Sequence, residues 1–228
     1  MVPVSAAGRL ASRPAELTPA AVRAPGVHRL DLGPGPEVLL AVPPGDAGPR
    51  RLLVFFHGAG GAAAQSISAV GDLAAARGVL VLAPSSAAST WDLLAGGLGR
   101  DVAVLDAALT EAAAGNEISR VAVGGFSDGA SYALSLGLAN GDLFEGVLAF
   151  SPGFYAPPRR VGMPFVWMSH GTGDRVLPVD RCGRPVSRKL ATEGYEVTYD
   201  KFDGGHVITP ELVAAALDRW PARRIRGW

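Results

Sequence analysis

The chain has 228 residues, of which 48% are hydrophobic and 18% charged. This length suits one domain of ordinary size, about 100–200 residues, and the apolar content excludes a disordered protein. The formal net charge is zero, with 21 basic and 21 acidic residues. Proteins that bind nucleic acid usually carry a basic surface, so we expect no nucleic-acid partner.

The first segment, residues 1–26, is rich in Ala, Pro and Arg and shows no sustained hydrophobic period. We predict an irregular, loosely attached lead-in there and a single domain over residues 27–228. The segment lacks the apolar stretch of a signal peptide, and no later run approaches the roughly 18 residues of a membrane span. We expect a cytoplasmic protein, unless a start codon set too far downstream hides a signal peptide.

Short apolar runs predict the strands. Val27–Leu32 and Glu37–Val42 flank the turn Gly33-Pro34-Gly35-Pro36 and predict an antiparallel hairpin at a sheet edge. Later runs are continuously apolar, as strands buried on both faces of a parallel sheet are. These runs are Leu52–Phe56, Val79–Leu82, Val121–Val123, Val147–Phe150 and Phe165–Met168, and a further strand is predicted at Glu196–Phe202.

Stretches with helical spacing of apolar residues separate the strands. A late helix is predicted over about Val179–Glu193, and the last one has Thr209 as N-cap, Pro210 at its first position and Pro221 as its stop. Because strand and helix alternate, we predict an α/β fold with a mostly parallel central sheet flanked by helices. Ligands bind at the carboxyl ends of the strands in such sheets, so chemistry is expected at that edge.

A G-x-S-x-G motif occurs at Gly125-Phe126-Ser127-Asp128-Gly129, between the strand Val121–Val123 and an apolar helix. This strand–turn–helix context presents a nucleophilic serine. The turn strains the serine backbone and admits only small neighbours, which the glycines provide. It also places Ser127 at a helix N-terminus, where N–H groups favour negative charge. The alternative, a glycine-rich turn without chemistry, leaves an exposed, sharply turned serine unexplained.

A serine hydroxyl needs a base to accept its proton and a third group to orient that base. Of the four histidines, His206 lies on a glycine-flanked loop after the strand Glu196–Phe202, and we predict that it is the base. The others are His57, which belongs to a separate motif, His170, which begins the turn with the candidate acid, and His28 in the N-terminal hairpin. The alternative for His206 is an ordinary surface histidine.

The predicted acid is Asp174, which follows the strand Phe165–Met168 and so reaches the same sheet edge. It gives the chain order Ser, Asp, His. Two rivals remain: Asp180, expected in or near the next helix, and Asp203, three residues before His206.

A glycine-rich loop, His57-Gly58-Ala59-Gly60-Gly61, directly follows the strand Leu52–Phe56. It is similar to the HGGG-type loop that donates one N–H to an oxyanion, and the second N–H comes from the residue after the nucleophile. The predicted oxyanion-hole residues are therefore Asp128 and either Ala59 or Gly60. The alternative is a plain glycine-rich connector.

These motifs, in this order, resemble the small α/β-hydrolase carboxylesterases, including the phospholipase/carboxylesterase family and its polyhydroxyalkanoate-depolymerase and feruloyl-esterase-like branches. The matching segments are His57–Gly61, Gly125–Gly129, His170–Pro178 and Gly205-His206 ahead of Glu211. The resemblance implies an α/β-hydrolase fold in which Ser127 is the nucleophile, His206 the base and Asp174 the acid. Residues 1–26 match no signature of that family.

The connection Ser151–Pro164 is too short for a helical cap, so we predict an open site without a cap domain. Trp91 and the pair Phe154-Tyr155 lie on loops at the predicted edge and are candidates for substrate contacts; packing in the core or in a loop is the alternative. The Asp128 carboxylate beside the nucleophile favours neutral esters over anionic ones.

Together these features predict a serine esterase that cleaves short to medium neutral carboxylic esters through an acyl-enzyme, with a small-molecule ester as its partner. We expect no metal and no cofactor, because the single cysteine, Cys182, has no partner for a disulfide or a zinc site. Alternatives on the same residues are a thioesterase, a polyester depolymerase or a peptidase. Another is a ligand-binding protein that keeps the fold without turnover.

Overall fold

The structure is a computed structural model that describes residues 8–19, 21–45, 48–95, 97 and 99–220. An eight-stranded sheet runs through it in the order β1-β2-β4-β3-β5-β6-β7-β8. The strands are β1 (Gly26–Arg29), β2 (Val38–Val42), β3 (Arg50–Phe56), β4 (Val79–Pro84), β5 (Ile118–Phe126), β6 (Phe144–Phe150), β7 (Phe165–Gly171) and β8 (Val197–Phe202). The α-helices are α1 (Ala63–Ala75), α2 (Arg100–Ala114), α3 (Asp128–Ala139), α4 (Gly183–Thr192) and α5 (Pro210–Arg219), with short 3₁₀ helices η2 (Pro14–Glu16) and η3 (Asp92–Ala95).

The sheet is parallel except at one edge. β1 pairs antiparallel with β2, and β2 pairs antiparallel with β4. From β4 through β3 and β5 to β8, every neighbouring pair is parallel. The predicted edge hairpin and mostly parallel sheet are confirmed. The runs expected to be buried on both faces are buried, apart from the half-buried Phe165, and in β4 all six residues are buried.

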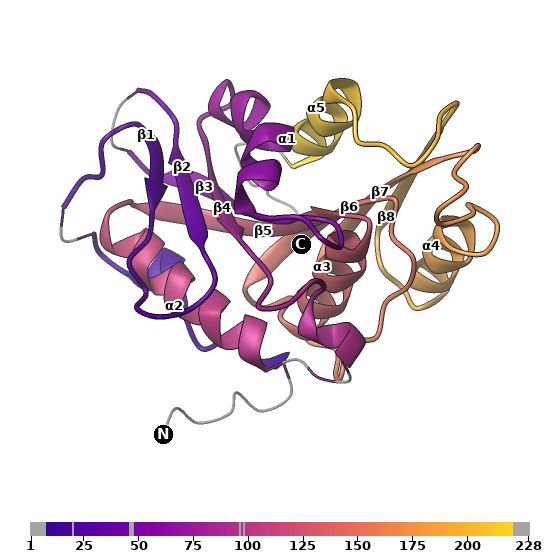
Figure 1. The fold of residues 1–228 in the computed structure, drawn as a ribbon, viewed down its shortest axis with the longest axis horizontal. Helices are drawn as coiled ribbons and strands as arrows, with labels where there is room; N and C mark the ends of the chain where they lie inside the picture. Colours follow the sequence, from indigo (N-terminus) through magenta and orange to yellow (C-terminus); the bar gives the residue numbers. More distant parts are fainter. Residues whose placement is uncertain (1–7, 20, 46–47, 96, 98, 221–228) are drawn as a thin grey trace.

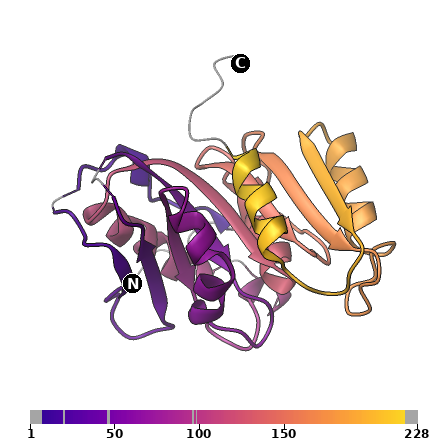
Figure 2. The ribbon, with the colours of Figure 1, turned by 90° about the horizontal axis from the view of Figure 1, so that it is seen from above.

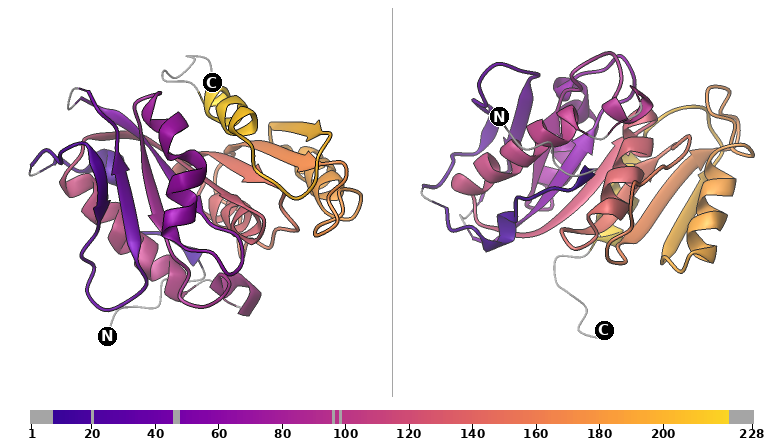
Figure 3. Two further views of the ribbon diagram at one scale, coloured as in Figure 1. Left: turned by 45° about the horizontal axis from the view of Figure 1, so that its top comes forward. Right: turned by 90° about the horizontal axis from the view of Figure 1, so that it is seen from below.

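Helices cover both faces of the sheet and form two hydrophobic cores. On one face, α1 and α5 lie side by side (Figures 1 and 2) and contribute Val70 and Leu217 to the core beneath them. On the other face, α2, α3 and α4 pack with Leu105, Leu136 and Leu190 in the core (Figure 3). The loops that follow β3, β5, β7 and β8 all leave the sheet at its carboxyl edge, between these two helical layers.

The N-terminal segment differs from the prediction. Residues 8–16 are held to the domain rather than loosely attached, because Leu10 is only 2% exposed and its N–H donates to the Asn140 side chain over 2.9 Å. The Arg9 guanidinium donates to both carboxylate oxygens of Asp142 at 2.7 Å. The N–H groups of Ala11 and Ser12 donate to Asp106. Buried leucine and paired arginine therefore tie down a segment without a regular sequence period.

Two predicted helices can be compared at their ends. α4 begins at Gly183, four residues later than expected, because the backbone of Cys182 departs from helical geometry and residues 178–182 form a turn. α5 begins as expected, with the Thr209 hydroxyl accepting from the Leu212 N–H and Pro210 at the first position. The predicted stop at Pro221 lies outside the described residues.

Residues 151–164, which join β6 to β7, are all described and contain no helix. The fold therefore has no separate cap at this position, as predicted. Within the described ranges, no helix combines the length and the apolar character needed to cross a bilayer.

Candidate active site

Ser127 occupies a sharp turn between β5 and α3. Its backbone has φ 58° and ψ −116°, a region that non-glycine residues rarely adopt and that costs energy unless the surroundings hold it. The Ser127 N–H donates to the Phe150 carbonyl oxygen at 2.9 Å, which holds the turn against β6. The neighbouring glycines are required by close packing: a Cβ at Gly125 would lie 2.4 Å from the Gly129 oxygen, and one at Gly129 would lie 2.3 Å from the Phe56 oxygen.

Three side chains from separate loops meet at this turn. The Ser127 hydroxyl lies 2.8 Å from His206 Nε2 and can donate to it. His206 Nδ1 lies 2.7 Å from Asp174 Oδ2 and donates to that carboxylate. This second bond fixes the tautomer, because a proton on Nδ1 leaves the Nε2 lone pair facing the serine. The arrangement can move a proton from the serine to the imidazole.

The Asp174 side chain is fully buried, yet it stays ionised. Burial raises the pKa of this carboxyl, but the hydrogen bond from His206 and the amides of Leu177 and Val176 outweigh it and lower the pKa overall. Both amides donate to Oδ1, at 2.8 and 2.9 Å. A fixed negative charge therefore faces the imidazole and can stabilise it when it becomes positive.

Neither rival acid reaches His206. Asp180 is 69% exposed at its side chain and pairs with Arg184 Nη1 at 2.6 Å. Asp203 is exposed on the loop after β8. Of the three carboxylates, only Asp174 lies in the buried turn after β7 that faces the imidazole.

His170 supports the turn that holds Asp174. It is fully buried at the end of β7, and its Nε2 lies 2.7 Å from the Leu177 oxygen and 3.3 Å from Asp174 Oδ2. A proton on Nε2 bridges both acceptors. His170 therefore ties Leu177, whose amide donates to Asp174, to the end of the strand, a role that its position beside the acid in the sequence did not reveal.

The two candidate donors in the loop after β3, Ala59 and Gly60, differ in their hydrogen bonding. The Gly60 N–H donates to the Ser89 oxygen at 2.7 Å, whereas the Ala59 N–H has no acceptor within the part of the chain that the structure describes. The amide of Asp128 is the first of α3, and the first amides of a helix have no intrahelical acceptor. Of the predicted oxyanion-hole residues, Ala59 and Asp128 therefore have N–H groups without an acceptor among the described residues, whereas the Gly60 N–H is engaged.

His57 shapes the same loop from inside the protein. It is 3% exposed, its Nε2 accepts from the Ser86 N–H at 3.0 Å, and its Nδ1 lies 2.7 Å from the Gly58 oxygen. Since Nε2 accepts, Nδ1 carries the proton and donates to Gly58. Burial lowers the pKa of His57, which favours this neutral form.

Comparison of the sequence with family models gives a match to the phospholipase/carboxylesterase family over residues 103–219, about half of the chain. The chain belongs to this family. Its members hydrolyse esters, and the fold is the α/β-hydrolase fold that the resemblance implied. A comparison with curated proteins gave no match.

Solved esterases share the fold. Esterase PE8 has a TM-score of 0.63 at 24% identity, covering 79% of this chain and 97% of that one. Est1E from Butyrivibrio proteoclasticus has a TM-score of 0.64 at 15% identity, covering 86% and 97%. Acyl-protein thioesterase 2 from Zea mays has a TM-score of 0.55 at 17% identity, covering 80% and 96%.

The three aromatic residues expected to contact substrate differ in their exposure to solvent. Trp91 is 1% exposed; it stacks on Tyr132 at 4.9 Å and donates from Nε1 to the His57 oxygen. Trp91 is therefore a core residue, and its assignment to the substrate is wrong, because packing removes its surface. Phe154 is 37% exposed, and Tyr155 donates from its hydroxyl to Glu193 at the end of α4.

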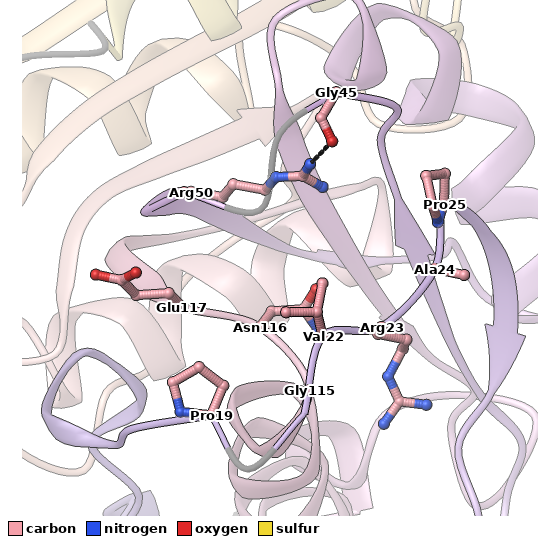
Figure 4. A pocket seen from close by; sticks show the side chains of 11 residues that line it. Pro19, Val22, Arg23, Ala24, Pro25, Gly45, Arg50, Gly115, Asn116 and Glu117 are labelled. Atoms are coloured by element: carbon pink, nitrogen blue, oxygen red, sulfur yellow. Dashed lines mark hydrogen bonds between the residues drawn. The ribbon is translucent and has the colours of Figure 1, made fainter.

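Two hollows bear on where this family member could hold a ligand. A cleft of about 300 Å³ lies at the carboxyl edge, beside Ala59 and Phe126. A smaller hollow of about 100 Å³ lies at the opposite edge of the sheet. It is lined by Asn116 and by Arg50, whose guanidinium donates to the Gly45 oxygen (Figure 4).

Phe126, which lines the cleft at the carboxyl edge, was not predicted as a site residue. Its position in the sequence, directly before the candidate nucleophile, could have indicated it.

Proposed function

We propose that the protein is a serine hydrolase that cleaves carboxylic esters through an acyl-enzyme, with Ser127 as nucleophile, His206 as general base and Asp174 as the orienting acid. The observation that carries the proposal is the unbroken chain of short hydrogen bonds from Asp174 through His206 to a serine in strained backbone geometry. Strain and proton relay at one residue are hard to explain by packing alone.

The reaction follows from this geometry. Ser127 Oγ attacks the ester carbonyl carbon while its proton passes to His206 Nε2. The carbonyl oxygen becomes an oxyanion and accepts hydrogen bonds from the amides of Ala59 and Asp128. Collapse of the tetrahedral intermediate breaks the bond to the alcohol oxygen, which takes the proton from His206. Water then attacks the acyl-enzyme by the same path, releasing the acid and restoring the serine.

Short to medium neutral esters are the substrates we assign. Residues 151–164 contain no cap helix that could enclose a long acyl chain. Asp128 adds a carboxylate beside the nucleophile, where it accepts from the Thr90 hydroxyl and, at 3.4 Å, from the Trp91 N–H. A negative charge there opposes anionic substrates.

The test replaces Ser127 with alanine. We expect Ser127→Ala to abolish turnover of p-nitrophenyl acetate and labelling by a fluorophosphonate, with an unchanged circular dichroism spectrum. Ser119→Ala is the matched control, since Ser119 is exposed at the other end of β5. Turnover retained in Ser127→Ala would refute the proposal, and stoichiometric rather than repeated release by the wild type would favour a binding protein.

A thioesterase is the second candidate, and the likeness in fold to a protein called acyl-protein thioesterase 2 favours it. The same relay and amides serve both reactions, because a thioester also forms an oxyanion. Matched oxygen and thiol esters of one acid, compared by kcat/KM, separate the two functions.

A further inference from the structure

We infer that the cleft between α1 and the nucleophile turn binds the alcohol part of the ester, and that this alcohol is small and uncharged. The inference rests on the proposed function. We call this hollow the α1 cleft; Ala59, Ser66, Ala69, Phe126 and Ile208 are among the residues that line it.

The α1 cleft lies beside the turn that carries the nucleophile. Phe126 directly precedes Ser127, and Gly58, which also lines the cleft, approaches both: a Cβ at Gly58 would lie 3.5 Å from Phe126 Cδ1 and 3.5 Å from Ser127 Cβ. Ala59, with its free amide, forms part of the same wall. The cleft therefore begins next to the nucleophile turn, within reach of a substituent on an ester bound at Ser127.

The cleft lies on the side of the base. The Phe126 ring packs against the His206 imidazole, with ring centres 4.8 Å apart and planes tilted by 38°. Ile208, two residues after His206, lines the same cleft. His206 must deliver its proton to the oxygen that leaves, so the leaving alcohol occupies the base side of the tetrahedral centre. This argument assigns the cleft to the alcohol rather than to the acyl chain.

The lining sets the chemistry of the ligand. The volume of about 300 Å³ lies at the lower end of the usual range for ligand pockets, about 300–1,000 Å³. Phe55, Phe126, Ala69 and Ile208 make much of the wall apolar, and no lining residue is charged, since burial lowers the pKa of His57 and keeps it neutral. Such a wall accepts an apolar, uncharged group and disfavours a charged one.

Ser66 adds one polar contact. It is 1% exposed, lines the cleft, and its hydroxyl has no hydrogen-bond partner among the described residues. A buried hydroxyl without a partner is unfavourable, and rotation of the Ser66 side chain toward the cleft would let it donate to an ether or hydroxyl oxygen on the bound alcohol. Ser66 therefore favours an alcohol that carries an acceptor oxygen over a plain alkyl group of the same length.

The test narrows the cleft with Ala69→Leu and uses Ala64→Leu as the matched control, because Ala64 is exposed on the same helix and does not line the cleft. Two series are compared by pH-stat: acetates of methyl, butyl and benzyl alcohol, and methyl esters of acetic, butyric and hexanoic acid. We expect Ala69→Leu to lower kcat/KM for benzyl acetate relative to methyl acetate by about 10-fold or more. The ratios within the acyl series should stay unchanged.

Deacylation provides an independent readout, since all acetates pass through one acetyl-enzyme. An alcohol cleft predicts that Ala69→Leu leaves the rate constant of deacylation unchanged, measured after a burst with p-nitrophenyl acetate. A changed deacylation rate with altered acyl ratios would overturn the inference and assign the cleft to the acyl chain. Unchanged ratios in both series would also overturn it.

A second variant tests the hydroxyl. The wild type should prefer 2-methoxyethyl acetate to butyl acetate, and Ser66→Ala should reduce that preference several-fold; an unchanged preference would overturn the role of Ser66. Failure of the inference remains distinct from failure of the proposed function. The latter shows in Ser127→Ala and in fluorophosphonate labelling of wild-type Ser127, whatever the substrate ratios in the α1 cleft variants.

Discussion

The Gly60 N–H donates a 2.7 Å hydrogen bond to the carbonyl oxygen of Ser89. An amide engaged in this way is not available to an oxyanion, whereas the neighbouring Ala59 amide has no acceptor in the described ranges of the chain. Of the two donors that the sequence left open, this relationship favours Ala59, and we propose that Ala59 makes the first oxyanion contact.

Removing the Ala59 amide is the first prediction. Ala59→Pro lacks the N–H and should lower kcat by about 10²–10³-fold, the usual effect of losing one oxyanion donor. Ala59→Gly keeps the N–H and should stay close to wild type. The measurement is steady-state hydrolysis of p-nitrophenyl acetate, with circular dichroism to verify folding. A folded Ala59→Pro enzyme with nearly normal kcat would contradict the assignment.

Neutralising the acid is the second prediction. Asp174→Asn cannot accept the His206 Nδ1–H through a carboxylate and should lower kcat by up to about 10⁴-fold, because the imidazole loses its orienting charge and its tautomer. Asp180→Asn and Asp203→Asn are controls with exposed carboxylates and should keep wild-type rates. A comparable loss in either control would show that the acid lies elsewhere.

The charge beside the nucleophile gives the third prediction. Asp128→Asn keeps the backbone amide and removes the carboxylate, so the hydrolysis of an ester with a free carboxylate near the scissile bond should rise about 5-fold relative to its neutral isostere, the effect of a charge interaction near 1 kcal/mol. The rates for the anionic and the neutral ester are compared as kcat/KM at low salt, in the wild type and in the variant. Equal rates for both esters, with no change in the variant, would contradict this account.

The nucleophile turn gives the fourth prediction. A Cβ at Gly129 would meet the Phe56 and His57 oxygens at 2.3 and 2.4 Å. Backbone atoms cannot yield cheaply, so Gly129→Ala should lower the free energy of unfolding by about 1–3 kcal/mol or more and abolish activity. Gly35→Ala is the control, because nothing lies within 4 Å of its Cβ position. Urea denaturation of the two variants and the wild type measures the change in the free energy of unfolding.

Acid stability of the N-terminal segment is the fifth prediction. The hydrogen bonds from Arg9 lower the pKa of Asp142 from 3.8 to about 2. A carboxyl whose pKa is lower in the folded state stabilises the fold above the unfolded pKa and loses that contribution as pH falls toward the folded pKa. The difference in unfolding free energy between wild type and Asp142→Asn should therefore be constant above about pH 5 and shrink between pH 3.8 and about 2. A difference that grows in this range would contradict the pairing.

The prediction of the elements succeeded where pattern and packing coincide. Continuous apolar runs such as Val79–Leu82 and Val147–Phe150 became central parallel strands, because a strand buried on both faces has no reason to alternate. The sequence pattern missed the attachment of residues 8–16 to the domain and the burial of Trp91. Both depend on partners far along the chain, such as Asn140 for Leu10 and Tyr132 for Trp91, and no local period encodes them.

The candidate site shows the same division. The order of motifs along the chain is sufficient to place Ser127, Asp174 and His206 after parallel strands, and hence at one edge of the sheet. Distances, tautomers and the exclusion of Asp180 depend on loop conformation. The α1 cleft arises where α1, the nucleophile turn and the loop after β8 converge. It therefore cannot be predicted from the sequence of any single segment.

By itself, the sequence determined the α/β class, the family and the order of the motif-bearing loops along the chain, because hydrophobic period, glycines at a tight turn and short motifs are local properties of the chain. Only the tertiary structure decided that the Gly60 amide is occupied, that Trp91 is buried and that Phe126 faces a cleft beside His206. These are contacts between residues distant in sequence, and they exist only once the layers have packed.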